Sequence, residues 1–180
     1  MSDALELRRL DHIGLTVPDL DAAIEFFHNA LGFEVLYIHG PYGDLEGDWS
    51  VREFELHARA VVDRVAMLRR DSLHLEVFQW SSPDQDRRVP RQSDHGGHHL
   101  AFYVEDVAEA AAQLRQHGAR VIGTVKALPG PEAGLEGVFI FTEAPWGLRI
   151  ELISYPNGKA YEKLGYAPAD PVLTAPASVD

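Results

Sequence analysis

The chain contains no cysteine. Disulfide bridges, thiolate metal sites and a cysteine nucleophile are therefore excluded. Positive charge is also scarce, because 16 lysines and arginines stand against 28 acidic residues and the formal net charge is −12. A chain this acidic lacks the electrostatic footprint for nucleic acid or an anionic membrane surface. We expect neither partner, although a local basic patch could still hold an anionic substrate.

Long apolar runs are missing too. No run approaches the roughly 18 apolar residues of a membrane span, and the early sequence has no basic segment followed by an apolar core of the signal-peptide type. We therefore expect a cytoplasmic protein. What remains is an ordinary globular composition, 46% hydrophobic and 24% charged over 180 residues. That length suffices for one domain, or for two small modules that share a core.

Two stretches of the chain, 11–17 and 98–104, resemble each other. Each carries a histidine near its start, alternates in polarity like a strand, and runs through an acidic turn into an amphipathic helical pattern. The same interval of 87 residues separates three pairs of positions: His12 and His99, Asp19 and Asp106, Ala23 and Ala110. Three more strands follow each helix. The repeat predicts two pseudo-symmetric modules, each ordered β-α-β-β-β.

The module boundaries follow from composition. We assign residues 8–80 to the first module, 81–97 to a polar linker, 98–155 to the second module and 156–180 to a C-terminal tail. Residues 39–50 are rich in Gly, Asp and Pro and are expected to form a loop, whereas 51–62 fit either a strand or a short helix. The tail is expected to be partly disordered, with a short docked helix around Tyr161 and Leu164 as the alternative.

Strand alternation selects one histidine in each module. In the first strand the branched apolar residues must cover the helix that follows, which leaves His12 on the opposite face. The same parity in the second module groups His98 with Leu100 and Phe102 on the helix-facing side. His99 is therefore the better candidate ligand of the adjacent pair. A shift of register would instead present His98, together with His95.

The last strand of each module adds a carboxylate. Glu76 alternates with apolar residues in the stretch 73–78, and Glu151 does so in 148–153, where it shares a face with Arg149. A mid-strand carboxylate between apolar neighbours is costly to bury unless it is paired or binds a metal. Because one histidine and one glutamate recur in each module, we predict a single metal site. Two imidazoles and two carboxylates suit one divalent ion (Zn, Ni, Co, Mn or Fe) with open positions for substrate.

The His-Ile-Gly and His-Leu-Ala strand starts, each followed by Val-x-Asp and an amphipathic helix, resemble the vicinal oxygen chelate superfamily. That group includes glyoxalase I, methylmalonyl-CoA epimerase, extradiol dioxygenases and fosfomycin or bleomycin resistance proteins. The resemblance covers roughly residues 8–155. It implies an α+β fold in which two βαβββ modules with pseudo-two-fold symmetry form a cup-shaped mixed sheet around a metal site. It also implies a ligand set of His12, Glu76, His99 and Glu151, similar to that of glyoxalase I.

The same resemblance implies the chemistry. A divalent-metal-dependent lyase or isomerase of this kind chelates a small oxygen-rich substrate through neighbouring oxygens and moves a proton through an enolate. Glu151 is the expected proton carrier, with Glu76 as its partner or alternate. Four side chains on the same face are expected to contact the substrate: His74, Phe78, Tyr103 and Arg149.

Two other functions stay open at this point. One is an Fe(II) extradiol-type ring-cleaving dioxygenase, although such enzymes use three ligands and the extra carboxylate of Glu76 speaks against it. The other is a non-catalytic drug- or metabolite-binding resistance protein, a kind that usually lacks the metal set.

The arginines at 87, 88 and 91 either hold an anionic group or are simply solvated. We expect a homodimer, with the cup closed within one chain or shared across two. The usual glutathione-binding residues are not identifiable, so a glutathione hemithioacetal is not the expected substrate.

Overall fold

The computed structural model describes residues 8–43 and 47–163. The lead-in at 1–7 and most of the expected tail, 164–180, lie outside the described residues, including Leu164 of the expected docked helix. The chain divides into two compact units, and the boundary falls between Arg88 and Val89. Within the described ranges no helix is both long and apolar enough to cross a membrane.

The first unit is built on a mixed four-stranded sheet with the order β1-β4-β3-β2. Strand β1 (Ile13–Thr16) runs parallel to β4 (Leu73–Ser81). Strand β3 (Val61–Arg70) pairs antiparallel with β4 on one side and with the edge strand β2 (Glu34–His39) on the other. The short first strand therefore lies directly beside the last strand of its own module. This adjacency brings the candidate histidine and glutamate together.

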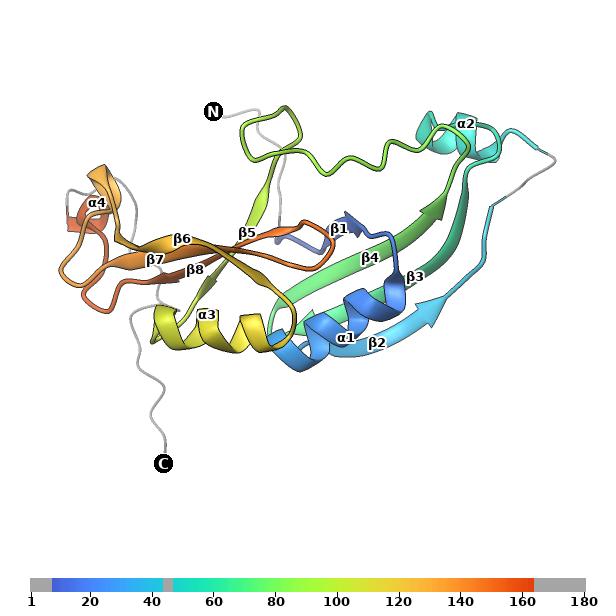
Figure 1. Cartoon of the computed structure of the whole chain (residues 1–180). Coiled ribbons are helices and arrows are strands. Elements are labelled where there is room, and N and C mark those ends of the chain that lie inside the picture. Colours follow the sequence, from blue (N-terminus) through green and yellow to red (C-terminus); the bar gives the residue numbers. More distant parts are fainter. Residues whose placement is uncertain (1–7, 44–46, 164–180) are drawn as a thin grey trace, which may run out of the picture. The chain divides into compact units, whose positions relative to one another are not determined.

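Helix α1 (Leu20–Leu31) lies across one face of this sheet (Figure 1). The carboxylate of Asp19 caps it by accepting a hydrogen bond from the Ala22 N–H at 3.0 Å, and Gly32 ends it in the left-handed conformation. Its apolar face is buried against β3 and β4, with Phe27 fully enclosed. Burying each such side chain stabilises the fold by roughly 1.5–3 kcal/mol. Because the helix covers this face of the sheet, the polar residues of the strands lie on the opposite face.

A short helix that the sequence did not clearly predict interrupts the first module. Helix α2 (Trp49–Phe54) begins inside the stretch 39–50 expected to be a loop. That expectation was wrong at its last two residues and at its first, His39, which belongs to β2. The stretch 51–62 fitted either a strand or a short helix. It holds the rest of this helix and, at its end, the start of β3. Ser50 is fully buried and its hydroxyl donates to the Ala60 carbonyl at 2.7 Å. This tertiary hydrogen bond pins a helix too short to be stable on local propensity alone.

The second unit repeats the arrangement with the strand order β5-β8-β7-β6. Strand β5 (His99–Tyr103) runs parallel to β8 (Arg149–Ser154), and β8 pairs antiparallel with β7 (Val138–Glu143). The edge strand β6 (Arg120–Ala127) is longer than the stretch 119–122 expected from the sequence. Each strand of this sheet thus has a counterpart at the same place in the first.

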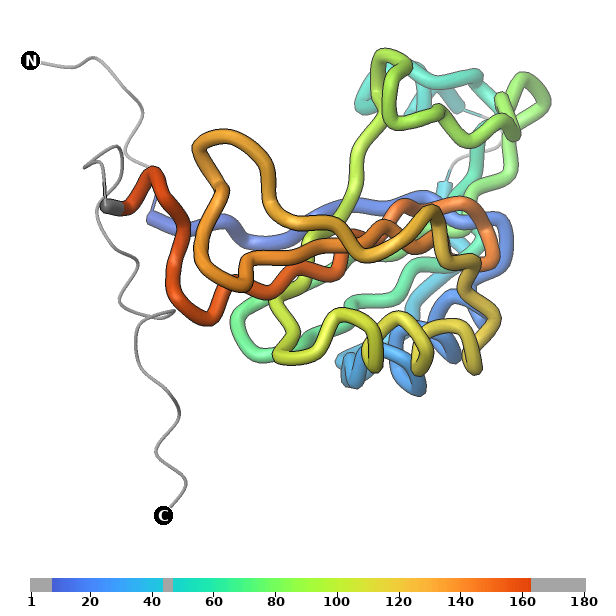
Figure 2. Tube along the Cα trace, turned by 60° about the vertical axis from the view of Figure 1, so that its left-hand side comes forward, coloured from blue at the N-terminus to red at the C-terminus, as the bar shows by residue number. Residues whose placement is uncertain are grey.

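Helix α3 (Val107–Gln116) packs against β6, β7 and β8 and is capped by the Asp106 carboxylate, which accepts from two backbone N–H groups at 2.9 Å. The loop after β6 holds the 3₁₀ turn η1 (Gly130–Glu132). This turn contacts the short helix α4 (Ala160–Lys163), which follows β8 at the end of the described chain (Figure 2). The predicted α+β class and the twofold βαβββ repeat are confirmed.

Candidate active site

Glu76 and His12 meet in the first module because of strand register. Glu76 lies in β4 between Leu75 and Val77, which are fully buried on the helix side, so its carboxylate projects from the opposite face. The parallel pairing sets Gly14 opposite Glu76, and His12 lies two residues earlier on that same face. The His12 Nε2 and Glu76 Oε2 atoms are 3.2 Å apart.

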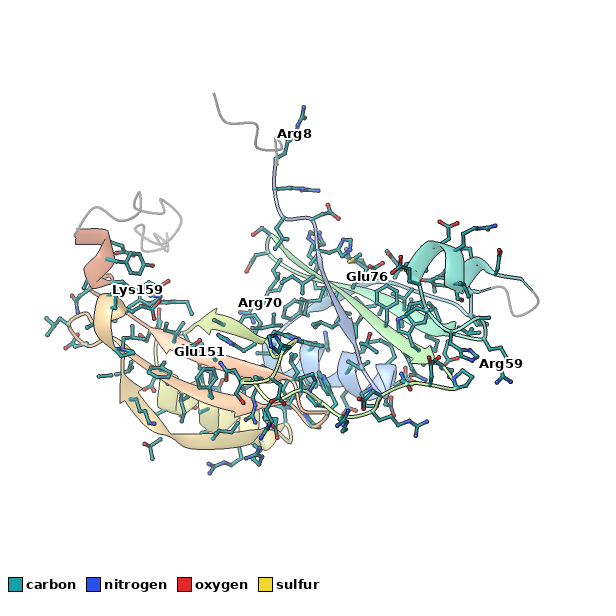
Figure 3. The ribbon with its side chains drawn as sticks, turned by 90° about the horizontal axis from the view of Figure 1, so that it is seen from above. Arg8, Arg59, Arg70, Glu76, Glu151 and Lys159 are labelled. Atoms are coloured by element: carbon teal, nitrogen blue, oxygen red, sulfur yellow. The ribbon has the colours of Figure 1, made fainter. Side chains whose placement is uncertain are left out.

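The second module reproduces this contact at the same register. Ala101 stands opposite Glu151, and His99 lies two residues before Ala101 on β5. The His99 Nε2 and Glu151 Oε2 atoms are 3.0 Å apart. The Glu151 side chain is 14% exposed and the Glu76 side chain 24%, so neither carboxylate is in open water. Figure 3 labels both glutamates, each on the last strand of its own module.

The two histidines differ in what holds their other ring nitrogen. The Nδ1 of His12 lies 3.0 Å from the Asp11 carboxylate. This hydrogen bond raises the pKa of His12, and the charge of Glu76 raises it further. The same hydrogen bond lowers the pKa of Asp11. The Nδ1 of His99 instead lies 3.1 Å from the Gln92 side-chain amide nitrogen.

Each His–Glu pair is chemically suited to a divalent ion. An imidazole Nε2 and a carboxylate oxygen point at each other at hydrogen-bond distance. Both are ligand atoms that divalent ions bind. Within residues 8–43 and 47–163, no three His, Asp or Glu side chains are grouped closely enough to hold an ion. Each module by itself therefore brings together one imidazole and one carboxylate, and these donor types fit the predicted divalent ion.

A run of aromatic rings continues from Glu76 along the face of the first sheet. Burial raises the pKa of the Tyr42 hydroxyl, and the Glu76 carboxylate raises it further. Successive ring centroids are 5.0–6.1 Å apart along the series Tyr42, Trp49, Phe54, Trp80 and Phe78. Of these five rings, only Phe78 was expected from the sequence to contact substrate. The other rings of the loop and α2 were missed because a short irregular segment has no periodicity from which its facing can be read.

Two of the expected substrate contacts have protein partners. Arg149 forms an ion pair with Glu143 at 3.1 Å, and Glu143 also holds Arg120 at 2.7 Å. The Tyr103 ring packs edge-on against Tyr155 with the ring centroids 4.8 Å apart.

The other two lie in β4 on the face of Glu76. His74 is half-buried and stands opposite Arg69, while Phe78 packs 5.8 Å from Trp80.

Two arginines of the segment 81–97, and His98 directly after it, have local partners. Arg88 pairs with Asp86, whose pKa this guanidinium lowers to about 2, and Arg91 pairs with Asp94. The Nδ1 of His98 lies 3.0 Å from the Gly96 carbonyl. His98 thus faces its own loop, whereas His99 faces Glu151.

Comparison with known proteins identifies the family. The model of the Glyoxalase/Bleomycin resistance protein/Dioxygenase superfamily matches residues 9–152, and the chain belongs to this superfamily. It is 45% identical over 155 residues to a 2-epi-5-epi-valiolone epimerase of Actinomyces sp., covering 84% of this chain and 82% of that protein. It is 29% identical over 145 residues to a lactoylglutathione lyase of Salmonella typhimurium, covering 81% and 91%. The fold matches a glyoxalase family protein from Bacillus cereus with a TM-score of 0.66, at 24% identity and over 86% and 98% of the two chains.

Proposed function

We propose that this protein is a divalent-metal-dependent epimerase that inverts a stereocentre next to the carbonyl of a small oxygen-rich ketone. The 45% identity to an enzyme named for epimerising 2-epi-5-epi-valiolone supports the reaction type and a ketone as substrate class. The observation that carries the proposal is the recurrence of one contact, histidine Nε2 to glutamate Oε2, at the same strand register in both modules.

In this proposal His12, Glu76, His99 and Glu151 would hold one ion. When bound, the ion would supply Lewis acidity, which makes the C–H bond next to a ketone carbonyl more acidic. The chain itself must then position the ketone and move the proton. A site lined by half-buried side chains restricts water around the carbon that loses its proton.

The two glutamates give epimerisation a physical basis. Inversion requires that a proton leave one face of the carbon next to the carbonyl and return to the opposite face. A carboxylate oxygen of Glu151 takes the first proton, since Glu151 is the less exposed of the two. Glu76, its counterpart in the repeat, delivers a proton from the other face. Direction reverses with the substrate epimer, so each carboxyl serves as acid in one direction and base in the other.

Proton exchange into the substrate tests this function directly. The purified protein is loaded with Zn²⁺ and incubated in D₂O with 2-epi-5-epi-valiolone, while ¹H NMR follows the C–H signal next to the carbonyl. We expect loss of that signal together with appearance of the second epimer. Glu151→Gln and Glu76→Gln should each slow the exchange by roughly 10²–10⁴-fold. Glu109→Gln on the exposed side of α3 is the matched control and should exchange at the wild-type rate. Exchange that persists in both site variants would contradict the assignment.

A second candidate is a lyase acting on a glutathione adduct, because the chain is 29% identical to a lactoylglutathione lyase. The Zn²⁺- and Ni²⁺-loaded forms should then convert the methylglyoxal–glutathione hemithioacetal. Turnover of that adduct without exchange into the ketone would favour the lyase over the epimerase.

A further inference from the structure

We propose that Asp11 and Gln92 are positioning residues that fix which ring nitrogen of His12 and His99 is available to the metal ion. This inference rests on the proposed function, since it assumes that both imidazoles are ligands. A metal-binding histidine is usually held in one tautomer by a hydrogen bond to its second ring nitrogen. The two modules meet that requirement with different residues.

Asp11 holds His12 from outside the sheet. Its Oδ2 lies 3.0 Å from the ring Nδ1, while the ring Nε2 faces Glu76. A carboxylate can only accept, so Nδ1 must carry the hydrogen and donate it. Arg9 in turn lies 3.2 Å from the other Asp11 oxygen. The Nε2 of His12 is thereby directed to the Glu76 carboxylate as the atom that binds the ion.

Gln92 takes the corresponding place at His99. Its amide nitrogen lies 3.1 Å from the ring Nδ1, and the ring Nε2 faces Glu151 at 3.0 Å. With the amide nitrogen donating, Nδ1 accepts and the hydrogen of the neutral ring is on Nε2. Rotating the amide by half a turn presents its oxygen instead, which accepts from Nδ1–H and frees Nε2 for the ion. An amide can therefore serve both the metal-free and the metal-bound ring.

A compact turn places Gln92 at this position. The Asp94 carboxylate accepts from the Arg91 backbone N–H at 3.0 Å, and the Asp94 N–H donates to the Arg91 carbonyl at 2.9 Å. The Gly97 N–H donates to the Asp94 carbonyl at 2.9 Å. Any side chain at Gly97 would collide with the Arg91 carbonyl. The turn thus fixes the backbone on both sides of Gln92 and explains the need for glycine at 97.

The need for Gln92 follows from a break in the repeat. His98 is the counterpart of Asp11, because the same 87-residue interval that relates the two ligand histidines also relates these neighbours. Its ring is turned to the Gly96 carbonyl, which lies 3.0 Å from the His98 Nδ1. Since His98 does not orient His99, the segment between the modules supplies the missing partner. This gives residues 91–97 a role beyond connecting the two modules.

The test is Zn²⁺ affinity measured by competition with a chromophoric chelator, on wild-type protein and single-residue variants. Asp11→Ala and Gln92→Ala should each weaken binding roughly 10- to 100-fold. Asp11→Asn and Gln92→Glu should recover most of that loss, since both keep an acceptor for Nδ1–H. His98→Ala, at the counterpart of Asp11, is the matched control and should bind within about twofold of wild type.

Long-range ¹H–¹⁵N NMR of the imidazole rings supplies a readout independent of affinity. In the Zn²⁺ form both rings should carry the hydrogen on Nδ1, and in the metal-free form His99 should carry it on Nε2. Unchanged affinity and tautomers in both alanine variants, while His12→Ala and His99→Ala abolish binding, would refute the positioning role and leave the proposed metal site standing. Wild-type protein that binds no Zn²⁺ would overturn both proposals.

Discussion

Gly14 lies directly opposite Glu76 in the parallel pairing of β1 with β4, and Ala101 occupies the same place opposite Glu151 in the second module. A Cβ added to Gly14 would meet no atom within 4 Å. Its backbone is also outside the left-handed region that favours glycine. Register, and not the glycine itself, is therefore what places His12 beside Glu76.

Gly14→Ala should consequently stabilise the protein. Alanine loses less backbone freedom on folding than glycine, which is worth about 0.4–1 kcal/mol where the native conformation suits both. Urea denaturation monitored by circular dichroism should show a higher midpoint at unchanged slope. A lower midpoint would mean that the face beside Glu76 is more crowded than the structure shows.

Ser50→Ala should destabilise the protein by roughly 1–3 kcal/mol, because it leaves the buried Ala60 carbonyl without its donor. Ser72→Ala, in the exposed turn between β3 and β4, is the control and should change the free energy of unfolding by less than about 0.5 kcal/mol. Equal effects of the two substitutions would show that α2 is not held by this hydrogen bond.

Arg149 and Arg120 share Glu143, which allows a substrate contact to be separated from an ion pair. Arg149→Met and Arg120→Met each remove one interaction with that carboxylate. Arg149 is two residues from Glu151 on β8, whereas Arg120 is on the edge strand β6, two strands away. Only Arg149→Met should therefore raise KM for the ketone, by roughly tenfold for one lost charged hydrogen bond. A similar KM in both variants would remove Arg149 from the expected substrate contacts.

The pH dependence of the metal-free protein should report on His12. Asp11, then Glu76, raises the pKa of His12 in the folded state above its ordinary value near 6.5. The stability that this pairing contributes is thus fully present below about pH 6.5 and is lost as the pH rises through the folded-state pKa. NMR titration of the metal-free protein should show His12 titrating above its ordinary range, and Asp11→Asn should bring it back. An ordinary titration in both proteins would contradict the pairing.

The sequence was sufficient where periodicity or an internal repeat carried the information. Alternation in 73–78 and 148–153 predicted which faces Glu76 and Glu151 occupy, and the parity of the strand at 98–104 selected His99 over His98 as the partner of a glutamate. Hydrogen bonds between individual side chains could not be predicted from the sequence. Nothing in local pattern shows that Gln92 bonds to His99.

The structure of irregular segments could not be predicted from the sequence either. Helix α2 depends on the buried Ser50 hydroxyl, a tertiary contact that local propensity does not reveal. The series of contacting aromatic rings from the loop, α2 and the end of β4 was likewise missed. The assembly of the two His–Glu pairs into one site, the dimer and the location in the cell stay predictions.

The stoichiometry of Zn²⁺ binding, measured by isothermal titration calorimetry on the full chain, tests the central claim most directly. If all four side chains hold one ion, the wild-type protein binds one Zn²⁺ per chain, whether the site forms within a chain or between chains. His12→Ala and His99→Ala should then each weaken that binding by roughly 100-fold or more, since either change removes a ligand from the same ion. Two ions per chain, or full affinity retained in one module when the histidine of the other is removed, would contradict the account.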